Sequence, residues 1–219
     1  MEWRGDSLVI HIDERANPLP FPIRGTVRLH PGAIGAGSFV LDAKERHRWW
    51  PVAPFAHVEA AFEAPSLRWS GDGYSDMNSG EEPLEDGFRH WNWARAGLNR
   101  GAAILYDVTT ATNGKLSLAL RIGADGAVQP VPPPPVRRMR PSIWLMPRDT
   151  RADAGPRPRI RRTLEDTPFY ARTMVDTKLF GEKVTAVHES LSLTRFKAAW
   201  VQKLLPYRIP RRDEPPGTG

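Results

Sequence analysis

Alternation of apolar and polar residues at every second position is the feature that most constrains the fold of this chain. In residues 115–122 the aliphatic side chains fall at positions 116, 118, 120 and 122, so they face one way in an extended backbone. Asn113-Gly114 stands directly before this stretch, and Asn-Gly is a strong signal for a hairpin turn. We therefore predict an antiparallel hairpin that joins Ala102–Val108 to residues 115–122.

The same pattern recurs in other short segments that are bounded by turn residues. Further strands are predicted near residues 8–12, 27–29, 58–62, 143–146, 159–163 and 184–188. The 22 Pro and 18 Gly among 219 residues favour many turns over long helices. Short strands separated by turns indicate an all-β fold, either an antiparallel barrel or a sandwich.

One helix is predicted, from Thr194 to Leu205 near the C-terminus. Three large apolar residues recur there every four positions: Phe196, Trp200 and Leu204. Thr194 can cap the start of the helix, and Pro206 ends it. Packing of this stripe on the β-core is the simpler explanation, and a basic membrane anchor is the alternative.

A domain boundary is predicted between about Glu63 and Gly71, because Pro65 interrupts the strand pattern there. Residues 1–66 would then belong to an N-terminal β-domain and residues 67–210 to a C-terminal one. Residues 211–219 are expected to form a disordered tail.

The formal charge of +6 and the isoelectric point near 10.0 favour anionic partners. Arginines cluster at 137–140 and 157–162, but no helix-turn-helix, zinc-finger or aromatic RNA-binding signature accompanies them, so no nucleic-acid partner is predicted. Solvated loop and strand faces explain most of this charge, and an anionic membrane surface is the alternative. The first residues lack the order of a signal peptide, and no apolar run approaches the roughly 20 residues that span a bilayer.

The segment from Gly71 to Arg95 combines glycines, polar residues and large aromatics in a way that core packing does not require. Tyr74, Asp76 and Asn78 alternate, so all three project from one face of an extended segment. Aromatic neighbours would remove water from the Asp76 carboxylate, which favours its protonated form and makes it an acid. A surface aspartate that accepts backbone hydrogen bonds is the structural alternative.

A second candidate group lies earlier in the chain. His47 and Trp49 share a face if this stretch is extended, and Trp50 adds apolar surface beside them. Trp91 and Trp93 close the longer motif as core residues or as the wall of a pocket. His188 and Glu189 are better explained by a structural role.

Several kinds of chemistry lack support in the sequence. The chain has no cysteine, no histidine pair with metal-ligand spacing, no phosphate-binding glycine loop and no Gly-x-Ser-x-Gly elbow. The sequence therefore indicates acid–base chemistry in an aromatic pocket, with no metal and no cofactor.

These motifs resemble those of the bacterial carotenoid 1,2-hydratases, also called hydroxyneurosporene synthases. The resemblance is carried by Gly-x-Gly-Tyr-x-Asp-x-Asn at 71–78 and by residues 46–51, 164–172, 188–193 and 205–212. It implies two lipocalin-like β-domains with a pocket between or beneath them. It also implies that His47, Trp49, Tyr74 and Asp76 matter for activity, and we take Trp50, Asn78, Trp91 and Trp93 as candidate substrate-binding residues. Family members usually carry a further segment before the equivalent of Trp3, so this chain is expected to be N-terminally short.

The implied reaction is addition of water to the end of neurosporene, lycopene or a related acyclic carotene. Protonation of the outer double bond would create a tertiary carbocation, which aromatic faces stabilise by up to about 2 kcal/mol and water captures. Either Asp76 or His47 could take the proton that the water loses. A cytoplasmic protein, peripheral to the inner or intracytoplasmic membrane, is expected.

Rival functions use the same residues differently. A non-catalytic lipocalin-type carrier would need the apolar pocket but no acid. A carbohydrate-active protein would use Asp76 and Glu81 with tryptophan stacking. A relative that cyclises a polyene is the third alternative.

Overall fold

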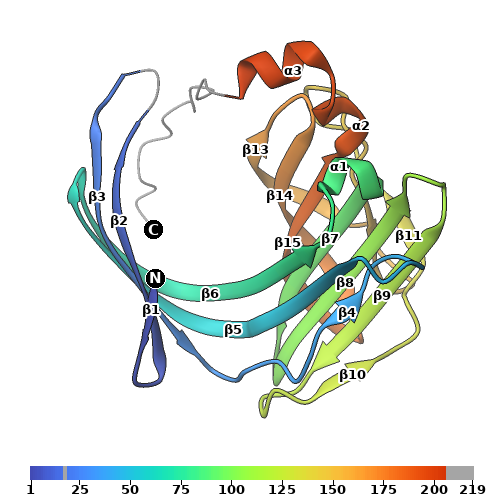
Figure 1. The fold of residues 1–219 in the computed structure, drawn as a ribbon. Helices are drawn as coiled ribbons and strands as arrows, with labels where there is room; N and C mark the ends of the chain where they lie inside the picture. Colours follow the sequence, from blue (N-terminus) through green and yellow to red (C-terminus); the bar gives the residue numbers. More distant parts are fainter. Residues whose placement is uncertain (17–18, 206–219) are drawn as a thin grey trace.

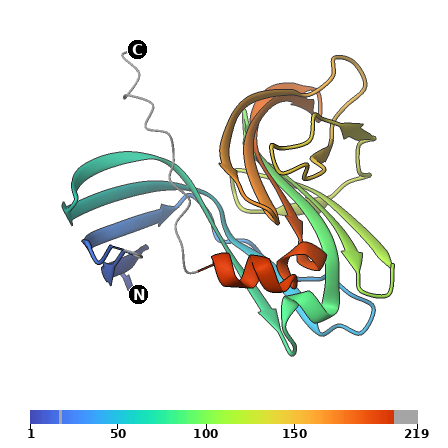
Figure 2. The same ribbon diagram turned by 90° about the horizontal axis from the view of Figure 1, so that it is seen from above.

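The computed structural model describes residues 1–16 and 19–205, most of which form two antiparallel sheets (Figure 1). The first sheet consists of β1 (Glu2–Arg4), β2 (Ser7–Arg15), β3 (Pro22–Pro31), β4 (Phe39–Val40), β5 (His47–Ala64) and β6 (Ser66–Gly80). Its order is β1-β2-β3-β5-β4. β3 and β4 pair with different parts of one edge of β5, and β6 pairs along the opposite edge. Both views show the β2–β3 end of this sheet extending away from the second sheet (Figures 1 and 2).

The second sheet has the order β10-β9-β8-β7-β15-β14-β13. Its strands are β7 (Phe88–Leu98), β8 (Gly101–Thr110), β9 (Lys115–Ile122), β10 (Val128–Pro130), β13 (Arg159–Asp166), β14 (Tyr170–Leu179) and β15 (Glu182–Ser192). A small third sheet pairs β11 (Val136–Arg138) with β12 (Asp149–Arg151). Three short helices complete the described chain: α1 (Leu84–Gly87), α2 (Leu193–Phe196) and α3 (Ala199–Leu204).

The two faces of the second sheet carry different side chains. One face packs an aromatic and aliphatic cluster against β5 and β6. The other is lined by alanines of β7, β8, β9 and β15, among them Ala94, Ala103 and Ala186. Small side chains let another segment approach the strands closely: Val131 packs against these alanines, and Arg151 of β12 forms an ion pair with Asp107 of β8 at 2.8 Å.

The predicted all-β, lipocalin-like fold is confirmed, and so is the hairpin between β8 and β9. Asn113 adopts φ +67°, the left-handed conformation that asparagine tolerates, and the Thr110 amide donates to the Gly114 carbonyl at 2.9 Å. The predicted domain boundary falls at the turn between β5 and β6. The division into two domains and the disordered tail stay predictions, and residues 206–219 lie outside the described part.

Two local predictions were wrong. Residues 143–146 form a turn and not a strand, and the expected helix over residues 194–205 is two short helices. The helix breaks because Ala198 is extended (ψ 130°), and the first piece is capped by Ser192, whose hydroxyl accepts from the Arg195 amide. Within the described residues, no helix has the length and apolar character needed to cross a membrane.

Candidate functional site

Two aromatic residues converge on one oxygen of Asp76. The Trp49 indole Nε1–H donates to Asp76 Oδ2 at 2.7 Å, and the Tyr74 hydroxyl donates to the same oxygen at 3.1 Å. Trp49 is fully buried and Tyr74 is half-buried, whereas Asp76 is exposed. The predicted same-face arrangement of Tyr74 and Asp76 is therefore present, but the expected removal of water from the Asp76 carboxylate is not.

Irregular pairing of β5 with β6 positions these residues. Trp50 pairs with Met77 and Ala53 pairs with Ser75, so two residues of β5, Pro51 and Val52, stand opposite Asp76 alone. A second shift of the same kind leaves Tyr74 as the single residue opposite two on β5, between the pairs Ala53–Ser75 and Ala56–Gly73. Proline lacks an N–H and disrupts the ladder, and such bulges re-aim side chains near functional sites.

Aromatic rings of β7 and β8 surround the Asp76 contacts. Trp49 meets Tyr106 edge to face with ring centroids 5.3 Å apart, Tyr74 lies 5.1 Å from Trp93, and Trp91 lies 6.1 Å from Tyr106. Burial raises the pKa of Tyr74 and of Tyr106 well above the ordinary range, and the nearby Asp76 charge adds to both shifts. Both hydroxyls therefore stay protonated at neutral pH.

Tyr106 was missed by the sequence analysis, although it sits in a correctly predicted strand. Its importance comes from its register, because β7 and β8 pair Trp93 with Tyr106 and so bring it to the site. Arg95 is another such residue. Its guanidinium carbon lies 5.8 Å from the Tyr74 ring centroid, its Nε donates to the Pro54 carbonyl at 2.7 Å, and burial lowers its pKa.

His47 is buried, and its hydrogen-bond partner is Asp42 and not Asp76. Its Nδ1–H donates to Asp42 Oδ2 at 3.0 Å, and its buried Nε2 has no hydrogen-bond partner among the described residues. His47 pairs with Gly80, four residues beyond Asp76, so the two backbone positions lie about 13 Å apart along the strand at a rise of about 3.3 Å per residue. No hydrogen bond joins His47 to Asp76 among the described residues, and a catalytic role for His47 stays a prediction.

Asp42 holds the His47 ring in place. Burial tends to raise the pKa of Asp42, but the hydrogen bonds from His47 and from the backbone N–H groups of Lys44 and Arg46 outweigh it and leave the pKa lowered. Asp42 is thus ionised at neutral pH and fixes which His47 nitrogen carries the proton.

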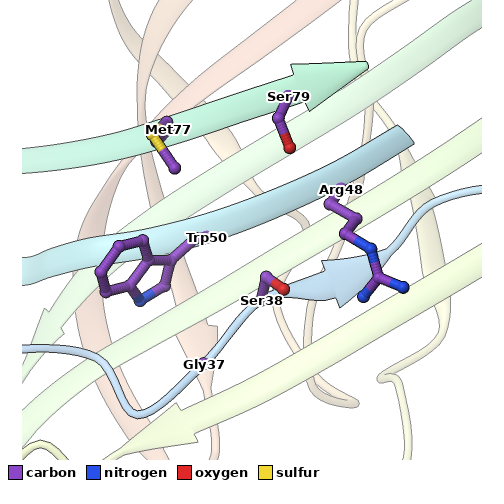
Figure 3. Close-up of a pocket in the computed structure, with 6 residues that line it drawn as sticks. All are labelled: Gly37, Ser38, Arg48, Trp50, Met77 and Ser79. Carbon is purple, nitrogen blue, oxygen red and sulfur yellow. The ribbon is translucent and has the colours of Figure 1, made fainter. Parts of the chain in front are cut away.

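Of the four proposed substrate-binding residues, the structure brings two into the aromatic cluster, Trp91 and Trp93. Asn78 pairs with Trp49 and is exposed. Trp50 follows Trp49 directly and so points to the opposite face of the sheet, where its Nε1–H donates to the Gly35 carbonyl at 2.8 Å. There it lines a separate pocket of about 260 Å³ with Met77 and Arg48 (Figure 3).

No set of three His, Asp or Glu side chains in the described residues is arranged to hold a metal ion. The prediction of cofactor-free chemistry concerns the reaction itself and stays a prediction. What the Asp76 group offers chemically is a carboxyl with one oxygen engaged by two fixed donors, beside a wall of electron-rich rings.

The fold and the site together define a class: a lipocalin-like β-protein with a carboxyl group held by aromatic donors. Solved structures of similar shape include a Nitrosomonas europaea protein described as AttH (TM-score 0.52, 14% identity, covering 86% of this chain and 66% of that one). CghA, solved with Sch210972, is similar at TM-score 0.51 and 14% identity, covering 86% of this chain and 65% of CghA. At this identity the likeness shows the fold alone.

Sequence comparison identifies the family. The chain matches the family described as carotenoid hydratase CrtC over residues 1–216, and it belongs to that family. Similar proteins named acyclic carotenoid 1,2-hydratase occur in Thiocapsa roseopersicina (51% identity, 96% of this chain), Rubrivivax gelatinosus (39%, 97%) and Cereibacter sphaeroides (40%, 97%). The chain spans 52%, 52% and 76% of these relatives, so it covers about half the length of the first two.

Proposed function

We propose that this chain carries the catalytic acid of an acyclic carotenoid 1,2-hydratase, an enzyme that adds water to the terminal double bond of an acyclic carotene. The observation that carries the proposal is the pair of donors, Trp49 and Tyr74, on a single oxygen of Asp76. Family membership and the names of the relatives support the reaction and the substrate class.

The geometry supports a specific sequence of steps. Because Oδ2 of Asp76 accepts two hydrogen bonds, a protonated Asp76 carries its proton on Oδ1. That proton adds to the CH carbon of the terminal double bond, and the π electrons form the new C–H bond, which leaves a tertiary carbocation on the outer carbon that bears two methyl groups. The rings of Trp93 and Tyr106 stabilise this cation by up to about 2 kcal/mol.

Water then attacks the carbocation, and the resulting oxonium ion returns a proton to the Asp76 carboxylate. One water molecule is added overall and the acid is regenerated, so the steps balance without a metal or an organic cofactor. Asp76, and not His47, recovers the proton in this scheme because His47 makes no hydrogen bond to the Asp76 group among the described residues, and its backbone pairs with Gly80, four residues beyond Asp76. His47 instead supports the strand end next to Trp49.

The partners are an acyclic carotene and water, and the location is cytoplasmic, peripheral to the inner or intracytoplasmic membrane. The basic charge of +6 and the insolubility of the substrate in water support the membrane location.

The test is to measure hydration by the Asp76→Asn variant. Purified protein is incubated with lycopene or neurosporene in detergent, and products are analysed by mass for added water. Asparagine keeps the shape of aspartate but delivers no acid proton, so turnover should fall about 10²–10⁴-fold. Asp72→Asn is the matched control on the same face of β6 and should retain activity.

Two outcomes would contradict the proposal. A folded Asp76→Asn protein that hydrates at the wild-type rate would remove Asp76 from the mechanism. A wild-type protein that binds carotene but yields no hydrated product would favour a non-catalytic lipocalin-type carrier.

A further inference from the structure

Residues 142–146 form a hydrogen-bonded turn that exposes three consecutive apolar side chains. Ile143 is 90% exposed, Trp144 44% and Leu145 70%, whereas Ser142 and Met146 at the base are buried. The Ser142 amide donates to the Met146 carbonyl at 3.0 Å, and the Leu145 amide donates to the Ser142 carbonyl at 3.0 Å. Leu145 adopts φ +56°, a left-handed conformation that is unfavourable for leucine. The backbone is therefore held in a costly geometry that points apolar groups into solvent.

Helix α3 extends this exposed surface. The ring centroids of Trp144 and Trp200 lie 6.3 Å apart, and Trp200 is itself 52% exposed. We define the apolar tip patch as Ile143, Trp144, Leu145, Trp200, Leu204 and Leu205, all of which are exposed. Arg195 of α2 joins its two parts, since its guanidinium donates to the carbonyls of Trp144 at 2.7 Å and Leu145 at 3.2 Å.

Positive charge borders the apolar tip patch. Arg140 precedes the turn, Arg195 underlies it and Lys203 lies on α3; none of these three is paired with a carboxylate among the described residues. Two carboxylates are nearby. Asp166 accepts a hydrogen bond from the Ile143 amide at 2.8 Å, and Asp86 pairs with Lys197 at 2.7 Å. The border is thus cationic on balance, in a protein with a net charge of +6.

We propose that the apolar tip patch docks the protein onto an anionic lipid bilayer, with the 143–145 tip inserted at the headgroup level. Tryptophan favours that depth because its ring is apolar and its N–H is polar, and the bordering cations match anionic headgroups. A protein partner fits less well. Stable protein interfaces use roughly 20–30 residues on each side, whereas this surface is a protruding tip of few residues.

The placement of the patch also suits a water-insoluble substrate, although the docking proposal does not depend on the proposed function. The three helices gather at one end of the second sheet (Figure 1). The Lys197–Asp86 ion pair joins α1 to the chain between α2 and α3, and Gly87 at the end of α1 packs on His47. The docked end is therefore the end of the molecule where β5 begins, with His47 as its first residue and Trp49 close behind.

The test is flotation of the full chain with vesicles of phosphatidylcholine and phosphatidylglycerol in equal amounts. The variant is Ile143→Ser combined with Leu145→Asn, because asparagine tolerates the left-handed conformation and preserves the turn. Partitioning should fall at least about tenfold, since burial of each side chain contributes about that factor. Trp69→Ser on β6, where Trp69 is 49% exposed, is the matched control and should partition like the wild type.

Charge reversal gives a second, independent readout. Arg140→Glu combined with Lys203→Glu should weaken binding to anionic vesicles, and raised salt should weaken binding of the wild type. Circular dichroism verifies that each variant is folded. The proposal is overturned if the Ile143→Ser, Leu145→Asn variant binds vesicles as tightly as the wild type, or if Trp69→Ser loses as much binding as that variant. It is also overturned, in favour of a protein partner, if the wild-type protein does not bind the vesicles at low salt. Hydration in detergent is measured separately, so a failure of the proposed activity leaves this result unaffected.

Discussion

At the scale of single residues, the site depends on how two donors share one acceptor. Trp49 and Tyr74 reach Asp76 Oδ2 from neighbouring strands, and each is supported by its own aromatic contact, Tyr106 for Trp49 and Trp93 for Tyr74. The two donors orient the carboxyl group, so their removal should impair the proposed hydration less than removal of the proposed acid, Asp76.

Tyr74→Phe tests this difference, because it deletes the hydroxyl and keeps the ring. We expect turnover to fall by about tenfold or somewhat more, the value of one hydrogen bond to a charged group. Tyr170→Phe is the matched control, since Tyr170 lies outside the aromatic cluster and makes no hydrogen bond to Asp76 among the described residues. Rates are measured by product mass as for Asp76→Asn. Equal losses in Tyr74→Phe and Asp76→Asn would assign the acid role to the pair and not to Asp76.

At the scale of elements, the buried side chain of His47 leaves no room for a larger residue at the end of β6. A Cβ added at Gly80 would lie 2.8 Å from His47 Cδ2, and one added at Gly87 would lie 2.5 Å from His47 Cε1. His47 cannot move aside readily, because it is buried and bonded to Asp42. Glycine at both positions is therefore a packing requirement of the histidine.

Gly80→Ala should lower the free energy of unfolding by about 1–3 kcal/mol through overpacking. Gly71→Ala is the control on the same strand, because a Cβ there meets nothing within 4 Å. Alanine at position 71 should be neutral or stabilising by up to about 1 kcal/mol, since glycine weakens a strand interior. Denaturant unfolding monitored by circular dichroism measures both, and similar values for the two variants would refute the packing argument.

At the scale of the whole molecule, the alanine-lined face of the second sheet buries a histidine. His188 is fully buried, and its Nε2–H donates to the Asp149 carbonyl at 2.8 Å, which links β15 to β12. Burial lowers the pKa of His188 to about 4, and the positive charge of Arg148 acts in the same direction against the Asp149 hydrogen bond.

This pKa shift predicts acid sensitivity of the fold. Between pH 6.5 and about 4 the unfolded chain binds a proton at His188 that the folded chain does not, so stability falls as the pH decreases. Neutral His188 makes its full contribution to the free energy of unfolding above pH 6.5. Up to about 3 kcal/mol of that free energy is lost by pH 4. Unfolding of wild type and His188→Gln across this range measures the effect.

The matched control for that series is His57→Gln, because His57 is exposed on the first sheet. Glutamine at position 188 keeps a donor for the Asp149 carbonyl but does not titrate, so its stability should depend less on pH than that of the wild type. An unchanged pH dependence in His188→Gln would show that other groups, such as the half-buried His90, dominate acid unfolding.

Local patterns in the sequence determined most strands, the Asn113-Gly114 turn and the shared face of Tyr74 and Asp76. These features depend on residues that are neighbours in the chain, where the period of two and the preference of Asn-Gly for positive φ act directly. The opposite orientation of Trp50 was also accessible from the same period, since it follows Trp49 immediately. The family emerged from motifs of this local kind.

Only the tertiary structure decided which distant residues meet. The pairing register of β7 with β8 brings Tyr106 to the site. Register shifts in the pairing of β5 with β6, at Pro51 and Pro54, place bulges opposite Asp76 and Tyr74. Hydrophobicity alone predicts an apolar run but not whether it is buried, so the exposed residues 143–145 read as a strand. Pairing between strands far apart in the chain depends on register, bulges and competing contacts, and these are properties of the assembled sheets.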